Sequence, residues 1–236
     1  MTDGDAAPTT SGGTSSVEIE LKFDVDDATP LPDWSGLPGV ASVGEAEGRE
    51  LDAVYFDTDD LSLAHAGYAV RRRTGGPDEG WHIKGPRGPE GGRVEQQWPL
   101  GEHADLPEQV RAAIAAVTVP TPSPGAAGAS PGAPGRVGPA TALAAIARIR
   151  NTRTAYALLD AAGRLVAEFV DDRVRALDER DGVERTWREW EFELGPAAPT
   201  SPASRAVLLA AAEAAVHAVG GRAAASASKL ARALGR

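Results

Sequence analysis

The stretch Val17-Glu18-Ile19-Glu20-Leu21-Lys22-Phe23 alternates apolar and charged residues without a break. Side chains of a β-strand point to opposite faces with a period of two, so the four apolar residues share one face. Glu18, Glu20 and Lys22 share the other face, which therefore carries two carboxylates and an ammonium. The pattern predicts a strand at 17–25 with its apolar side on a core, although an ordinary half-exposed strand would give the same alternation.

Charged side chains also gather on single faces of other predicted strands. Strands are expected at residues 51–58, 68–74, 81–84, 93–98, 147–158, 166–174 and 187–194, from their β-forming residues and alternation. Parity groups the acidic residues as Glu168 with Asp172, and Glu189 with Glu191 and Glu193. The basic residues of the shorter strands are Arg71, Arg73, Lys84 and Arg93. A sheet with one charged face either leaves that face in water or curls it inward to line a polar tunnel.

The strand predicted at 147–158 carries three arginines whose orientation the pattern leaves open. Arg148 and Arg150 share parity, and Arg153 faces the other way unless a bulge at residues 151–152 resets the alternation. Parity alone therefore does not decide which of the three points to the charged face.

Helices and loops complete the expected organisation. Apolar periodicity predicts helices at 106–117 and 204–219, a last short helix at 226–234, and helical turns within 33–43 and 61–66. Asp57 and Thr58 are expected to form a turn or a helix N-cap. Residues 1–16 are expected to be a disordered tail, and residues 119–140 a Pro/Gly/Ala-rich loop.

Composition limits the functional classes. The chain has 236 residues, 42% of them apolar, so it can bury a core, and it has no cysteine for a disulfide or thiolate metal site. A net charge of −10 argues against non-specific binding of nucleic acid or membranes, but a local basic cluster can still bind a small anion. The N-terminal residues lack the pattern of a signal peptide, and a cytoplasmic location is expected.

Several motifs together resemble the CYTH superfamily, also called the triphosphate tunnel metalloenzymes. They are Glu18-x-Glu20-x-Lys22, Tyr55-Phe56-Asp57-Thr58, Arg71-x-Arg73 with Trp81-x-x-Lys84, Arg153-Thr-Ala-Tyr156, and Ser228-Lys229. The family groups class IV adenylate cyclases, thiamine triphosphatases and inorganic triphosphatases. The resemblance implies an α+β fold, namely a closed antiparallel β-barrel of about eight strands with helices packed outside. It implies a single domain at residues 17–236.

The charges and the resemblance suggest a division of labour. Clustered carboxylates repel one another, and Mg²⁺ or Mn²⁺ relieves that repulsion because both ions prefer oxygen ligands. The expected metal ligands are Glu18, Glu20, Glu168, Asp172, Glu191 and Glu193. The expected triphosphate-binding residues are Lys22, Arg71, Arg73, Lys84, Arg93, Arg150, Arg153 and Lys229. Glu18, Glu20 and Lys22 are the expected catalytic residues, and His82 is a weaker candidate for a base.

The expected reaction is divalent-metal-dependent hydrolysis of a small triphosphate such as inorganic tripolyphosphate. A class IV adenylate cyclase is the alternative, since the same residue types serve attack of a ribose hydroxyl on ATP. A non-catalytic module that binds polyphosphate or nucleotide is the third reading, which the many carboxylates disfavour. No P-loop, dinucleotide fingerprint, nucleophile elbow or HExxH motif is present. The sequence leaves the substrate, the preferred metal and the oligomeric state open.

Overall fold

A computed structural model describes residues 12–88, 91–101, 105–118, 142–226 and 228–236. Its strands are β1 (Thr14–Glu18), β2 (Glu20–Val25), β3 (Ser42–Val43), β4 (Glu47–Asp57), β5 (Ala69–Thr74), β6 (Gly80–Arg87), β7 (Arg93–Trp98), β8 (Ala144–Leu159), β9 (Leu165–Asp178), β10 (Val183–Leu194) and β11 (Arg222–Ala223). Its helices are α1 (Ser62–His65), α2 (Glu108–Thr118), α3 (Pro202–Ala218) and α4 (Lys229–Ala233). Most of the predicted tail and all of the predicted loop at 119–140 lie outside the described residues, while Thr14–Ser16 belong to β1.

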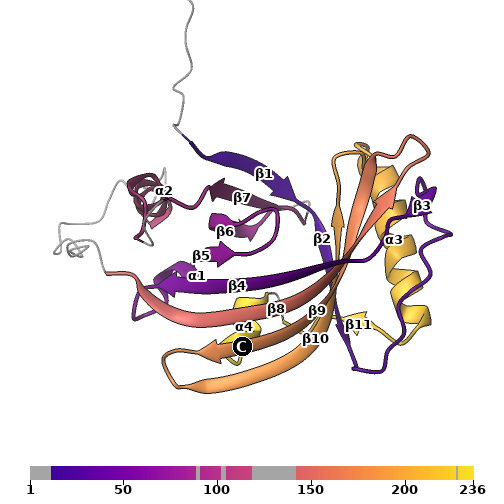
Figure 1. Cartoon of the computed structure of the whole chain (residues 1–236). Helices are drawn as coiled ribbons and strands as arrows, with labels where there is room; N and C mark the ends of the chain where they lie inside the picture. Colours follow the sequence, from indigo (N-terminus) through magenta and orange to yellow (C-terminus); the bar gives the residue numbers. More distant parts are fainter. Residues whose placement is uncertain (1–11, 89–90, 102–104, 119–141, 227) are drawn as a thin grey trace, which may run out of the picture.

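The strands form one curled antiparallel sheet (Figure 1). The described sheet has eleven strands in the order β1-β7-β6-β5-β4-β8-β9-β10-β2-β11, with β3 paired to β8. The expected closed barrel of about eight strands is therefore not confirmed, and the sheet is an open half-barrel. The long strands β4, β8, β9 and β10 form its middle and carry most of its curvature (Figure 1).

The predicted strand at 17–25 is divided at Ile19. Its first part pairs with β7 and its second part with β10, so the covalent chain at Ile19 connects two distant sides of the sheet. The backbone of Ile19 also accepts a hydrogen bond from Leu194 N at 3.0 Å. Val17 was expected to face the core, but it is 65% exposed, because on β1 that face meets only Val94, itself 50% exposed.

Apolar side chains pack on both faces of the sheet. On the face opposite Glu20 and Lys22, Phe23 packs with Trp190 and Phe192 under α3, and Trp81 and Ile83 pack under α2. A third cluster lies on the inner face and joins Ile149 and neighbouring strand residues to α4. The helices α2 and α3 therefore cover the outside of the half-barrel, and α4 covers part of its inside.

Most predicted elements are confirmed, with boundaries that differ by a few residues. The segment 33–43 is an exception, since it forms turns and β3 instead of a helical turn. The N-cap residue of α1 is Leu61 and not Asp57, but the Asp57 carboxylate accepts hydrogen bonds from the first-turn backbone N–H of Leu63 and Ala64, both at 2.9 Å. Within the described residues, none of the helices combines the length and the apolar character needed to cross a membrane.

Candidate active site

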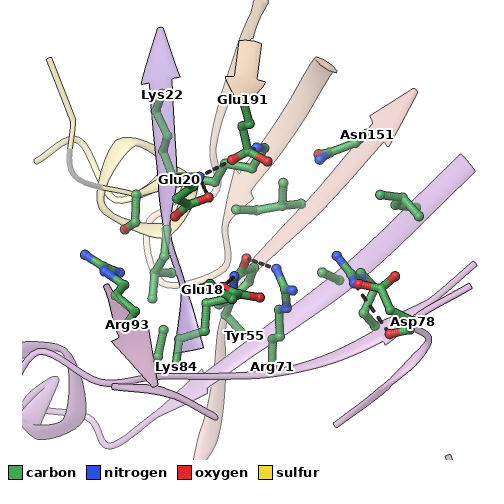
Figure 2. A pocket seen from close by; sticks show the side chains of 18 of the residues that line it. Glu18, Glu20, Lys22, Tyr55, Arg71, Asp78, Lys84, Arg93, Asn151 and Glu191 are labelled. Atoms are coloured by element: carbon green, nitrogen blue, oxygen red, sulfur yellow. Dashed lines mark hydrogen bonds and ion pairs between the residues drawn. The ribbon is translucent and has the colours of Figure 1, made fainter. Parts of the chain in front are cut away.

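The inner face of the half-barrel holds a cavity lined by charged side chains (Figure 2). Among the described residues, seven bases and five acids line it, so it is cationic in a chain whose net charge is −10. The bases are Lys22, Arg71, Arg73, Lys84, Arg93, Arg153 and Lys229, and the acids are Glu18, Glu20, Asp78, Glu191 and Glu193. The concentration of bases is local, as the sequence allowed, and it favours an anionic ligand.

The acids of β1, β2 and β10 form one wall. Antiparallel pairing puts Glu20 opposite Glu193, and Lys22 opposite Glu191, on adjacent strands. Lys22 donates a hydrogen bond to Glu20 at 2.8 Å and forms a further ion pair with Glu191. The pKa of Glu20 is lowered, because the Lys22 ammonium outweighs the opposing effect of burial.

Glu18 and Glu193 are the acids of this wall with too little compensating charge. Burial raises the pKa of Glu18 to about 8, with a hydrogen bond to Glu95 adding to the shift, although Lys84 donates to its carboxylate at 2.5 Å. Burial also raises the pKa of Glu193, which forms no ion pair with any described residue. Both carboxyls would release a proton more readily if a cation lay beside them.

A second cluster of acidic residues surrounds the ammonium group of a lysine. Asp172, Glu189 and Glu191 each offer one oxygen, and these oxygens lie within 4.8 Å of one another. The Lys229 ammonium contacts all three carboxylates, at 2.9, 2.5 and 2.8 Å. Ser228 caps α4 by accepting a hydrogen bond from Ala231 N, which fixes the start of the helix and directs Lys229 into the triad.

Nearby cations also act on two of these carboxyl groups. The pKa of Asp172 is lowered because Lys229 and Arg153 together outweigh the effect of burial, and that of Glu191 is lowered because Lys22, Lys229 and Arg153 together do so. Arg153 donates to Asp172 at 2.8 and 2.7 Å and to Glu191 at 2.9 Å. The triad is thus a neutralised charge cluster in which a divalent ion would have to displace an ammonium.

The remaining bases come from β5, β6 and β7. Arg71 and Arg73 share the inner face of β5, roughly 7 Å apart along the strand, and Lys84 follows on β6 and Arg93 on β7. Burial and the neighbouring guanidiniums of Arg71 and Arg153 lower the pKa of Arg73 to about 9. These bases are crowded, and a bound anion would relieve their mutual repulsion.

Three of the predicted residues, Arg150, Glu168 and His82, are not part of the lining of the central cavity. Arg150 points away from the cavity: its side chain is 55% exposed and pairs with Asp52 at 3.2 Å, because β8 continues past it without the bulge that would turn it inward. Glu168 lines a neighbouring cavity and accepts two hydrogen bonds from Arg49, both at 3.0 Å. His82 is 1% exposed and lies behind the lining, so it is not placed to act as a base on a ligand.

Sequence reasoning also missed residues of the site. Parity grouped Glu189 with Glu191 and Glu193, but Glu189 was not among the expected metal ligands, and the structure puts it in the triad with Asp172 and Glu191. Glu95 lies behind Glu18, its Oε1 2.9 Å from His82 Nδ1. Asn151 lines the cavity at 6% exposure with a buried Oδ1 that has no hydrogen-bond partner, and no motif indicates it.

Two sets of carboxylates could therefore bind a metal ion, and they differ in how far their charge is already compensated. The triad already has its cation in Lys229, whereas burial raises the pKa of Glu18 and of Glu193, which face the cavity together with Glu20. Carboxylate oxygens without histidine or cysteine suit Mg²⁺ or Mn²⁺. Among the described residues, the triad is the group whose carboxylate oxygens lie within 4.8 Å of one another, so spacing favours the triad, whereas uncompensated charge favours the second set.

Comparison with known proteins agrees with this architecture. A family model described as the CYTH domain matches residues 16–208. The chain belongs to the CYTH family. Two curated relatives from Mycobacterium tuberculosis, the uncharacterized proteins MT2285 and Rv2226, are each 33% identical to this CYTH chain over 189 residues. That match covers 75% of this chain and 33% of theirs, so the chain spans about a third of the length of these relatives.

Solved CYTH-like structures share the fold at low sequence identity. A protein from Bacillus halodurans described as a candidate adenylate cyclase has a TM-score of 0.54 and 18% identity, covering 92% of this chain and 97% of its own. The PH1819 protein from Pyrococcus horikoshii has a TM-score of 0.50 and 13% identity, covering 92% and 98%. At these identities the likeness concerns the fold.

Proposed function

We propose that this CYTH protein hydrolyses a small triphosphate, such as inorganic tripolyphosphate, with the help of a divalent metal ion. The observation that supports the proposal most is a cavity that is lined by more bases than acids and that includes an acidic residue, Glu18, whose pKa is raised by burial. A linear triphosphate carries several negative charges along its length, and bases on facing walls can hold all of them. Anion binding alone would not require carboxylates that face the same space.

The bases position the substrate in this proposal. Arg71 and Arg153 approach the cavity from β5 and β8, and Lys84 from β6, so the phosphate chain is held from several sides. Arginine forks bind phosphate oxygens bidentately, whereas lysines act as point charges. Since phosphoryl transfer depends mainly on positioning and charge neutralisation, this arrangement suits hydrolysis.

The acidic wall provides the metal ligands. Glu18, Glu20 and Glu193 would hold Mg²⁺ or Mn²⁺ through carboxylate oxygens, and Glu18 would give up its proton when the ion binds. When bound, the ion would neutralise charge that develops on the phosphate oxygens. Lys22, between Glu20 and Glu191, keeps both carboxylates oriented and presents its ammonium to the cavity.

A cyclase remains the alternative, and one observation bears on it. One sector of the lining is apolar and includes Leu51, Tyr55, Ile149 and Leu230, with the buried Tyr55 ring as its aromatic member. This sector offers contact area to an organic group attached to the triphosphate. A cyclase would place an adenine there.

One assay distinguishes the hydrolase, the cyclase and the non-catalytic binding module. Phosphate release is measured from tripolyphosphate, thiamine triphosphate and ATP with Mg²⁺, Mn²⁺ or EDTA, and cyclic AMP is measured in the ATP reactions. The variants are Glu18→Gln and Glu20→Gln, with Glu45→Gln, on an exposed loop, as the matched control. Metal-dependent release that both site variants abolish and the control retains supports the hydrolase. Cyclic AMP without phosphate release supports the cyclase, and metal-independent tripolyphosphate binding without turnover supports a binding module.

A further inference from the structure

The turn between β5 and β6 inserts a carboxylate into the phosphate-binding wall. Asp78 lines the cavity and forms an ion pair with Arg73, which is 5% exposed (Figure 2). Arginine binds carboxylate and phosphate with the same fork of N–H donors. Asp78 thus occupies the position that an oxygen of a bound phosphate chain would take on Arg73.

The turn holds Asp78 in a defined place. Its backbone carbonyl oxygen accepts hydrogen bonds from His82 Nε2 at 2.9 Å and from Gln97 Nε2 at 3.2 Å. The turn also packs closely on β4: a Cβ atom added to Gly75, whose φ is +79°, would lie 2.0 Å from the Glu50 carbonyl oxygen. The carboxylate is therefore directed at Arg73 by a fixed backbone.

Asp78 also marks the boundary between two cavities. The central cavity and the cavity next to Glu168 share four lining residues, and Figure 2 shows Asp78 on the opposite side of the site from Arg93. The four shared residues are Leu51, Asp78, Arg153 and Glu193. A phosphate chain that extends from the central cavity in this direction has to pass the carboxyl groups of Asp78 and Glu193.

The charge changes sign beyond this boundary. Among the described residues, the second cavity is lined by two bases and three acids, whereas the central one has seven bases and five acids. Arg49, the base that the second cavity adds, is already bound to Glu47 and Glu168 at 2.9 and 3.0 Å. Extra phosphate units would therefore meet repulsion instead of new partners.

We propose that Asp78 is a specificity-determining residue that limits the length of the phosphate chain, so that the site prefers tripolyphosphate over longer linear polyphosphates. The proposal rests on the proposed function and names its substrate class more narrowly. Removing the carboxylate frees Arg73 for a fourth phosphate unit and removes one of the two negative charges at the boundary.

The test compares kcat/KM for tripolyphosphate and tetrapolyphosphate in the full chain with Mg²⁺ or Mn²⁺. Asp78→Asn and Asp78→Ala remove the charge, Asp78→Glu keeps it, and Glu79→Gln is the control, because Glu79 is on the same turn, exposed and outside the cavity lining. The two neutral variants should raise the tetrapolyphosphate-to-tripolyphosphate ratio about tenfold, which corresponds to ~1.4 kcal/mol. Asp78→Glu and the control should keep the wild-type ratio. The side chain of Asp78 is 49% exposed, so its removal should leave the protein folded.

Calorimetric titration of both polyphosphates in EDTA provides a readout that does not depend on turnover. The neutral variants should bind tetrapolyphosphate about tenfold more tightly relative to tripolyphosphate than the wild type does. An unchanged ratio in folded, active neutral variants overturns the role of Asp78 and leaves the hydrolase intact. If the wild type binds both polyphosphates but hydrolyses neither, the proposed reaction is wrong. The ratio of tetrapolyphosphate to tripolyphosphate affinity in the wild type and the neutral variants then decides the role of Asp78. A wild type that neither binds nor hydrolyses either chain overturns both.

Discussion

Replacement of Lys229 by methionine tests whether the acidic triad needs an internal cation. Methionine has a similar length and no charge, so the substitution removes the ammonium and leaves most of the packing of α4. The Lys229 side chain is 9% exposed and lies within 2.9 Å of oxygens from Asp172, Glu189 and Glu191. In the variant these buried carboxylates lose their common partner.

The expected cost follows from the burial of the group. Removal of one partner from a buried ion pair costs about 3–5 kcal/mol, because the remaining charge is left uncompensated. Arg153 still contacts Asp172 and Glu191, so a value near the lower end of that range is expected. For a chain of this size the melting temperature should fall by roughly 6–20 °C.

Thermal and urea denaturation in EDTA measure the loss, with Arg222→Met as control. Arg222 is 62% exposed and pairs with Asp26, so its replacement should cost less than about 1 kcal/mol. Mg²⁺ or Mn²⁺ should restore part of the stability of Lys229→Met, because the vacated triad keeps three oxygens within 4.8 Å of one another. A Lys229→Met protein as stable in EDTA as the wild type would refute the reasoning, since the triad would then carry no buried charge that needs this lysine.

Three further outcomes are expected. Glu18 should make the metal-free protein less stable as pH rises from about 4.5 to about 8, because the unfolded chain releases the Glu18 proton while the fold retains it. Burial lowers the pKa of His82 to about 4, which acts in the opposite direction up to about pH 6.5, so the Glu18 contribution is the difference between the pH-dependent urea profiles of the wild type and Glu18→Gln. Arg153→Met should lower triphosphate hydrolysis about 10²-fold or more, while Arg150→Met, whose side chain lies outside the cavity, should retain wild-type kcat/KM. Asp57→Ala should destabilise the protein by about 1–2 kcal/mol, measured by urea denaturation, because it removes the carboxylate that accepts the first-turn N–H groups of α1.

Residue parity carried most of what the sequence could predict about the site. Alternation placed Glu18, Glu20 and Lys22 on one face, and the structure puts all three in the cavity lining. The sequence left the orientation of Arg150 and Arg153 open and named both as triphosphate-binding residues, and of the two only Arg153 lines the cavity. Parity works on β2 and β10 because their apolar residues are covered by α3, which leaves the charged residues of both strands to the opposite face.

The parts that could not be predicted depend on contacts between distant segments. The position of Asp78 on Arg73 results from the close packing of a glycine turn on β4, and no local pattern encodes that contact. The division of the N-terminal strand at Ile19 depends on which strands lie on either side, β7 or β10. The contact of Lys229 with the acidic triad depends on where α4 packs, and the sequence of a five-residue helix does not determine that position.

The strand β10 shows why neighbouring identical residues come to differ in role. Glu191 and Glu193 are two residues apart on one face, yet Glu191 contacts Lys22, Lys229 and Arg153, whereas Glu193 pairs with no described base. The pKa of Glu191 is therefore lowered and that of Glu193 raised. A carboxylate whose charge is already compensated contributes to a fixed framework, and one that lacks compensation favours an added cation. The arrangement of bases thus separates a charge-compensated part of the acidic wall from a part whose carboxyl charge is not compensated.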